Sequence, residues 1–128
     1  MQIKKLTPNL IVREVEASLK FYCEVFGLET GFTVPEKAPY VFGSVTNGPV
    51  EVFFNEQKAV EKEYPELAKN IGGSLTLYME VDDLKAVLAR VQKMGAKITM
   101  PVTEQFYGMR EFAFADNAGY TITIAERI

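Results

Sequence analysis

The sequence predicts an α+β fold built from two copies of one βαβββ module. Residues 12–19 are matched in pattern by residues 81–88, which lie 69 positions later in the chain. Each copy runs from a hydrophobic stretch into an amphipathic helix that ends near a glycine, Gly27 or Gly95. Because a solenoid usually needs three or more repeats to bury a continuous core, two copies favour a pair of modules that form a cleft of curved mixed sheets.

The same order of elements is predicted in both modules. Apolar residues spaced by three and four predict one helix that begins within each copy of the repeat, and Asp82-Asp83 are suited to cap the second helix. Asn47-Gly48 predicts a hairpin, and Asp116-Asn117-Ala118-Gly119 predicts a type I turn. The predicted strands are residues 6–12, 28–34, 40–45 and 50–54 in the first module, and residues 75–81, 97–102, 109–115 and 120–125 in the second.

We interpret residues 1–128 as one domain, because a chain of 128 residues can support a single hydrophobic core. The first module spans residues 1–55 and the second spans residues 74–128. The polar and charged residues 56–73 between them predict a linker that is partly helical.

Composition excludes several classes of partner. The net charge is −3 and basic residues are not clustered, whereas a nucleic-acid partner needs a basic face. No apolar stretch approaches the roughly 20 residues that span a bilayer, so no membrane partner is expected. Cys23 is the single cysteine, so no intrachain disulfide is possible. Together with an N-terminus that does not look like a signal peptide, this predicts a cytoplasmic location.

The chain contains no histidine, which removes the commonest general base and the Ser-His and Cys-His nucleophile pairs. Glu51 lies in a predicted strand between Val50 and Val52, so it should point to the opposite face from them. If the valines face the helices, Glu51 faces the cleft, where it could act as a base or pair with a cationic ligand. An exposed or structurally paired carboxylate is an equally good interpretation.

Aromatic residues are the other candidates for ligand binding. Phe53 lies two residues from Glu51, and Tyr78 lies two residues from Thr76, so alternation places both on the cleft side. Phe106 and Tyr107 precede Gly108 in a predicted loop, where aromatic residues are hard to explain as core. We therefore expect these two rings to stack on a ligand.

Arg110 is a further candidate ligand contact. It could pair with an acidic neighbour or with the carboxylate of a ligand, and the sequence leaves both possibilities open.

A longer signature runs through the chain: Val12-x-x-Val15-x-x-Ser18-x-x-Phe21-Tyr22-x-x-Val25-Phe26-Gly27-Leu28, partly repeated as Val81-Asp82-Asp83-Leu84, with Asp116-x-x-Gly119 before the last strand. It resembles the vicinal oxygen chelate superfamily, which includes glyoxalase I, extradiol dioxygenases, fosfomycin-resistance transferases and bleomycin-resistance proteins. The resemblance covers essentially the whole chain and implies the glyoxalase/bleomycin-resistance fold.

The resemblance also bears on metal binding. Metal-dependent members take one ligand from each of four strands, typically His, Glu, His and Glu. Those positions fall on Thr7, Glu51, Thr76 and Thr123 here. A neutral threonine hydroxyl is a poor ligand for a divalent metal, so the resemblance implies no metal centre and no cofactor.

Residues 106–119 resemble the aromatic-Gly … Arg-Glu-Phe-Ala … Asp-x-x-Gly stretch of bleomycin-resistance proteins. Those proteins have no metal and catalyse no reaction; they are dimers that sequester a planar, cationic drug in clefts between subunits. This chain departs from the pattern by having Tyr107 in place of tryptophan and what looks like an inserted Met109.

Three functions are compatible with the sequence. The favoured one is a metal-independent homodimer, related to antibiotic-resistance proteins, that sequesters a planar or amphiphilic ligand of cationic or aromatic character. The alternative is an enzyme acting on a small carbonyl or aromatic substrate, with Glu51 as base or residual metal ligand. The third is a subunit or sensor domain with a vestigial cleft, which the threonines do not distinguish from the first.

Overall fold

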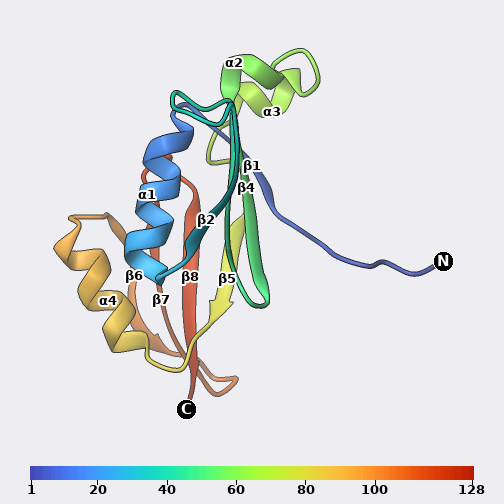
Figure 1. Cartoon of the computed structure of the whole chain (residues 1–128). Helices are drawn as coiled ribbons and strands as arrows, with labels where there is room; N and C mark the ends of the chain where they lie inside the picture. Colours follow the sequence, from blue (N-terminus) through green and yellow to red (C-terminus); the bar gives the residue numbers. More distant parts are fainter. The chain divides into compact units, whose positions relative to one another are not determined.

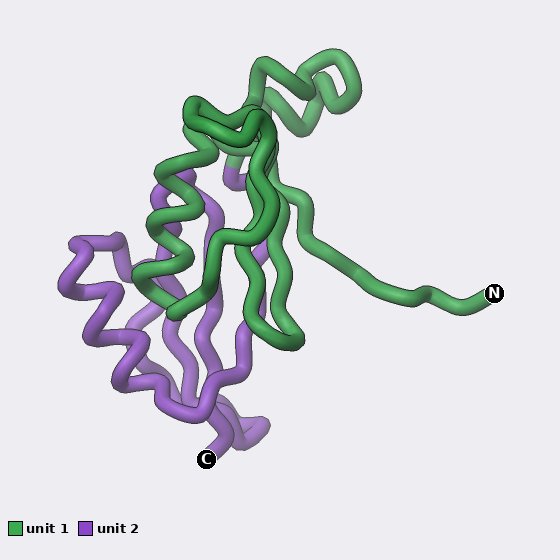
Figure 2. The backbone as a smooth tube through the Cα atoms, viewed as in Figure 1, with its two compact units in different colours: residues 1–71 green, residues 72–128 purple.

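The computed structural model describes residues 1–128, which divide into two compact units, Met1–Ile71 and Gly72–Ile128 (Figure 2). Each unit holds one four-stranded mixed sheet and a long helix. The α+β fold with two βαβββ modules is therefore confirmed. The predicted linker, residues 56–73, lies almost wholly in the first unit and contributes two short helices to it.

The sheet of the first unit has the strand order β1-β4-β3-β2, with β1 parallel to β4 and the remaining pairs antiparallel. The predicted first strand is shortened because Pro8 has no N–H to donate, although its carbonyl still accepts from Phe53 N at 2.9 Å. The elements are β1 (Asn9–Val12), α1 (Val15–Phe26), β2 (Glu29–Val34), β3 (Phe42–Asn47), β4 (Val50–Glu56), α2 (Gln57–Val60) and α3 (Pro65–Lys69) (Figure 1).

The second sheet repeats this plan with the order β5-β8-β7-β6, in which β5 is parallel to β8 and the other pairs are antiparallel. Its elements are β5 (Thr76–Glu80), α4 (Leu84–Lys93), β6 (Ile98–Glu104), β7 (Met109–Ala115) and β8 (Thr121–Arg127) (Figure 1). No helix in the chain has the length and apolar character needed to cross a membrane.

The ends of the two long helices follow the predicted signals. Gly27 closes α1 at φ 68°, and its N–H donates to Cys23 O at 2.9 Å. Gly95 follows α4 at φ 70° and donates to Gln92 O at 3.0 Å. Glycine adopts this left-handed conformation without steric penalty. At the start of α4, Asp83 Oδ1 accepts from Ala86 N at 3.1 Å, as an N-cap does.

One face of each sheet packs against its helix. In the first unit the ring of Tyr22 from α1 meets the ring of Phe54 from β4 edge to face, with centroids 4.9 Å apart. Both rings are fully buried, together with Val45 of β3. In the second unit the fully buried Phe112 and Ile124 pair across β7 and β8 on the corresponding face.

The opposite faces carry the alternate residues, and no long helix of the same unit packs on them. We call them the open faces. Because strand residues alternate between faces, Val52 and Phe54 point to α1 while Glu51 and Phe53 lie on the open face of the first unit. This is the arrangement that alternation predicts for Glu51. In the second unit Glu111 lies on the open face, whereas its neighbours in the chain, Arg110 and Phe112, lie on the helix-covered side.

Replacing Gly43 by valine should destabilise the first unit, because α1 lies directly against this residue of β3. A Cβ at Gly43 would stand 3.0 Å from side-chain atoms of both Leu19 and Val15. We expect Gly43→Val to lower the free energy of unfolding by about 1–3 kcal/mol, the usual cost of overpacking. Urea denaturation measures this change in the free energy of unfolding. The control is Thr46→Val on the open face, which should lower the free energy of unfolding by about 1 kcal/mol or less. Equal effects of both changes would contradict this packing.

Candidate functional site

The open face of the first unit carries Glu51 with a cation from its own chain. Lys5 Nζ forms an ion pair with Glu51 Oε1, and the hydroxyl of Thr7 lies 3.4 Å from the same oxygen. The carboxylate of Glu51 is therefore structurally paired, which is the second of the two interpretations that the sequence left open.

A row of three aromatic rings lies on the same face. Phe53 of β4 contacts Phe42 of β3, with ring centroids 5.1 Å apart, and Phe42 contacts Phe32 of β2 at 6.3 Å. Phe32 is 67% exposed. Because large apolar side chains are costly to leave in water, this row is suited to contact a ligand or another protein surface.

The open face of the second unit has different chemistry. Glu111 of β7 is only 3% exposed. The hydroxyl of Tyr78 donates to Glu111 Oε2, and the hydroxyl of Tyr107 donates to Oε1 at 2.8 Å. Both tyrosines remain about half exposed, 52% and 50% respectively. We call Tyr78, Tyr107 and Glu111 the Glu111 cluster.

The tyrosine pKa values reflect this contact. The pKa of Tyr78 is raised to about 12, above all by its hydrogen bond to Glu111 and then by burial and the negative charge of the carboxylate. The pKa of Tyr107 is raised by the same causes in the same order. Removing a proton from either phenol would place two negative charges side by side, so both hydroxyls stay protonated at neutral pH.

Phe106 adds a third ring beside the cluster. It is 98% exposed, and its ring stands nearly perpendicular to that of Tyr107, at 88° with centroids 5.1 Å apart. The structure thus brings two of the predicted stacking residues together with Tyr78, a third predicted site residue, around a carboxylate that the sequence interpretation did not single out.

The family can be decided from the whole chain. A sequence model described as Glyoxalase/Bleomycin resistance protein/Dioxygenase superfamily matches residues 3–124. The chain belongs to this superfamily. The resemblance seen in the sequence is confirmed, without deciding between its metal-free and metal-dependent branches.

Solved structures of the superfamily have the same fold. A glyoxalase/bleomycin resistance protein/dioxygenase family enzyme from Burkholderia phytofirmans PsJN has a TM-score of 0.80 at 21% identity, covering 95% of this chain and 97% of its own. TioX from Micromonospora sp. ML1 has a TM-score of 0.77 at 16% identity, covering 98% of this chain and 100% of its own. A superfamily member from Sphaerobacter thermophilus DSM 20745 has a TM-score of 0.77 at 20% identity, covering 99% of this chain and 100% of its own. At these identities the likeness establishes the fold alone, and no curated protein matches the chain.

The superfamily's metal positions do not fit a metal in this chain. Within the first unit, Thr7 lies against Glu51, whose charge is already paired with Lys5. Within the second unit, the hydroxyls of Thr76 and Thr123 hydrogen-bond to each other at 2.7 Å. Three neutral hydroxyls and a carboxylate held by an ammonium group are a poor donor set for a divalent ion. No group of three or more His, Cys, Asp or Glu side chains is placed to hold one.

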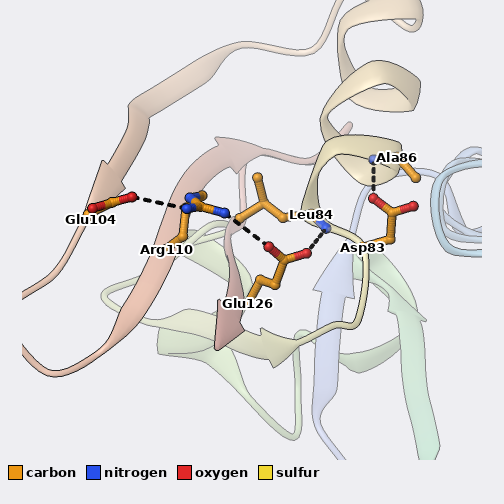
Figure 3. A network of polar contacts seen from close by, with 6 residues as sticks. All are labelled: Asp83, Leu84, Ala86, Glu104, Arg110 and Glu126. Carbon is orange, nitrogen blue, oxygen red and sulfur yellow. Dashed lines mark hydrogen bonds and ion pairs between the residues drawn. The ribbon is translucent and has the colours of Figure 1, made fainter. Parts of the chain in front are cut away.

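Arg110, predicted as a ligand contact, lies on the helix-covered side of its sheet. It pairs with Glu104 at 3.0 Å and with Glu126 at 3.3 Å, and the other oxygen of Glu126 accepts from Leu84 N at 3.0 Å (Figure 3). The pKa of Arg110 is raised, chiefly by the hydrogen bond to Glu104. This network ties the start of α4 to β6, β7 and β8, so we leave Arg110 out of the candidate site.

The alternation of β7 could have revealed Glu111. Side chains of a strand alternate between its two faces, and the apolar Phe112 and Phe114 must face the helix. Arg110 then lies on the same face as these phenylalanines, and Glu111 lies on the open face. The contact with Tyr78 could not be found this way, because it depends on β5 and β7 both flanking β8.

The Glu111 cluster can be tested by titrating the tyrosines through their absorbance near 295 nm. Glu111→Gln removes the carboxylate that raises the pKa of Tyr78, so we expect that pKa to fall from about 12 towards its ordinary value of 10.0. Tyr78→Phe identifies the transition by deleting it. Because the folded-state pKa is raised, the Tyr78 contact stabilises the protein fully below pH 10 and is lost as the pH rises through about 12. An unchanged titration in Glu111→Gln would contradict the contact.

Proposed function

We propose that this protein is a metal-independent binding protein that sequesters a planar or amphiphilic small molecule. The observation that carries the proposal is the exposed aromatic surface around the Glu111 cluster, formed by Phe106, Tyr107 and Tyr78. Small-molecule sites are typically lined by apolar and aromatic side chains with a few placed polar groups, and the cluster supplies both kinds of group.

The chemistry of the superfamily's metal positions supports the absence of a metal requirement. The hydroxyls of Thr76 and Thr123 hydrogen-bond to each other, and the carboxylate of Glu51 is paired with Lys5. The same ion pair weighs against the enzymatic alternative, because a carboxylate held by an ammonium group is a poor general base. No contact of Glu51 favours that alternative, so we do not pursue it.

Ligand titration tests the proposal directly. Bleomycin-type glycopeptides, other planar antibiotics and small aromatic metabolites should be titrated by calorimetry, in the presence and absence of a chelator. Aromatic contacts contribute roughly 0.5–1.5 kcal/mol each beyond the area they bury, so Phe106→Ala with Tyr107→Ala should weaken binding about tenfold or more. The chelator should leave the affinity unchanged.

The control for this double variant is Tyr64→Ala, which removes an exposed aromatic ring next to α3 instead. It should bind the ligand as the wild type does. Absence of binding below about millimolar for every compound, or full affinity in the double variant, would contradict the proposal.

We further propose that the protein acts as a homodimer. Figure 1 shows the residues before β1 leaving the sheet of the first unit as an extended arm, and Met1, Ile3 and Leu6 of this arm are exposed. Phe32 and Val34 are exposed on the edge strand β2. Large apolar side chains are thus exposed on the arm and on the opposite edge of the sheet. Exposed apolar surface favours an interface, and a second copy of the chain would cover it.

Light scattering should give twice the mass of one chain at micromolar concentration. Replacing Ile3 and Leu6 by glutamate should shift the protein towards single chains, because charge is unfavourable in an apolar interface. Replacing Glu14 by lysine at the exposed N-terminal end of α1 is the control and should leave the mass unchanged. A wild-type protein with the mass of one chain would contradict the homodimer.

A further inference from the structure

The loop between β6 and β7 carries Phe106 and Tyr107, and its two ends are held unequally. The end next to β7 is fixed to the end of β8, because Gly108 O accepts from Ile128 N at 3.0 Å. The end next to β6 depends on pairing with β7 alone, since β6 is an edge strand. That pairing is irregular, with register shifts on both sides of Met100. The placement of the two rings therefore needs a further restraint at the β6 end.

Arg110 supplies a restraint at the base of this loop. It is paired across the β6–β7 ladder with Glu104, the last residue of β6. Its Nη2 donates to Glu104 Oε1 at 3.0 Å, and its Nη1 donates to Glu126 Oε2 at 3.3 Å (Figure 3). The other oxygen of Glu126 accepts from Leu84 N at 3.0 Å. The end of the edge strand is thus clamped through Arg110 to β8 and to the start of α4.

One guanidinium group serves two carboxylates in this clamp. Neither Glu104 nor Glu126 has another cationic partner, so without Arg110 the two negative charges would repel each other. The side chain of Glu126 is only 24% exposed and is held by Leu84 N, whereas that of Glu104 is 66% exposed on the edge strand. Glu104 is therefore the partner that would move, and the β6 end of the loop would move with it.

Two consecutive residues of β7 hold the loop from opposite faces of the sheet. On the helix-covered side Arg110 holds the β6 end through Glu104. On the open face Glu111 accepts a hydrogen bond from the Tyr107 hydroxyl at 2.8 Å. Phe106 is almost fully exposed, and its ring meets the ring of Tyr107. A single hydrogen bond from a half-exposed phenol holds a loop weakly in water, so both attachments are needed to fix the rings.

We infer that Arg110 is a positioning residue of the binding site: by clamping Glu104 to Glu126 it holds the β6–β7 loop, so that the rings on this loop meet a ligand in one fixed arrangement. A ligand then does not have to order the loop when it binds, which lowers the entropic cost of binding. The inference rests on the proposed function and gives Arg110 a part in it without contact with the ligand. The sequence pointed to Arg110 as a ligand contact, whereas its side chain acts from the helix-covered side.

Titration of the tyrosines tests the clamp without a ligand. In Arg110→Gln the loop should loosen, and the pKa of Tyr107, which is raised chiefly by the hydrogen bond to Glu111, should fall towards its ordinary value of 10.0. Tyr78 reaches the same carboxylate from β5 rather than from the loop, so its pKa should not fall. Loss of the Arg110 charge by itself would raise both pKa values, so a fall confined to Tyr107 reports a loosened loop. Tyr107→Phe identifies the transition.

Glu104→Ala opens the clamp from its exposed side and leaves the contact between Arg110 and Glu126 in place. It should also lower the pKa of Tyr107 by more than that of Tyr78. The matched control is Glu66→Ala, which removes an exposed carboxylate with a lysine partner on α3 and should leave both pKa values unchanged. A pKa of Tyr107 that stays at its wild-type value in Arg110→Gln and Glu104→Ala, or that falls only as far as that of Tyr78, overturns the inference.

Quinoline serves as the planar probe for binding, titrated by calorimetry into the full-length protein at neutral pH. Arg110→Gln and Glu104→Ala should each weaken its binding about two- to tenfold, the effect of losing one well-placed aromatic contact. Glu66→Ala should bind quinoline as the wild type does.

The outcomes separate the inference from the proposed function. If quinoline binds the wild type and both clamp variants equally, the inference fails and sequestration of planar ligands stands. If the wild type binds neither quinoline nor any of the planar antibiotics, the proposed function fails, and the part of Arg110 in binding fails with it. The tyrosine titrations then still decide whether Arg110 holds the loop.

Discussion

The packing of one amphipathic helix on one face of a four-stranded sheet is the constraint on which the rest of each unit depends. In the first unit the contact between Tyr22 and Phe54 fixes which face of β4 is covered. Because side chains of a strand alternate between the two faces of the sheet, Glu51 and Phe53 then lie on the opposite face from Phe54. A slip of one residue would bury Glu51 under α1, where its charge would have no partner, so the register is specified strongly.

The two units use this common plan for different chemistry. On the first open face the carboxylate is neutralised by Lys5, and the remaining surface is a row of phenylalanine rings. On the second open face the carboxylate of Glu111 is buried and its charge is not neutralised within the chain. The two modules thus share the packing of helix on sheet, whereas their open faces carry different side chains and different contacts.

Local patterns were sufficient for the order of the main elements and for the face on which Glu51 lies. The glycine at the end of each helix, the cap at Asp83 and the position of Glu51 all follow from spacings of a few residues. The contacts on the open faces could not be predicted from local patterns, because these contacts join strands that are distant in sequence. Lys5 reaches Glu51 only because β1 runs beside β4, and Tyr78 reaches Glu111 across β8, where Ala125 has too short a side chain to block the path.

Tyr107 shows how a departure from a family pattern can carry information. Residues 106–119 resemble a stretch of bleomycin-resistance proteins, with Tyr107 in place of their tryptophan, and both residues have a large aromatic ring. They differ in their polar atoms: the indole N–H can only donate, whereas a phenol donates one proton and still accepts. At 2.8 Å from Glu111 the Tyr107 hydroxyl stabilises the buried carboxylate and presents lone pairs to the exposed side. An arginine at this position would also satisfy Glu111, but it would cancel the charge within the chain. Tyrosine therefore keeps the carboxylate buried without cancelling its charge.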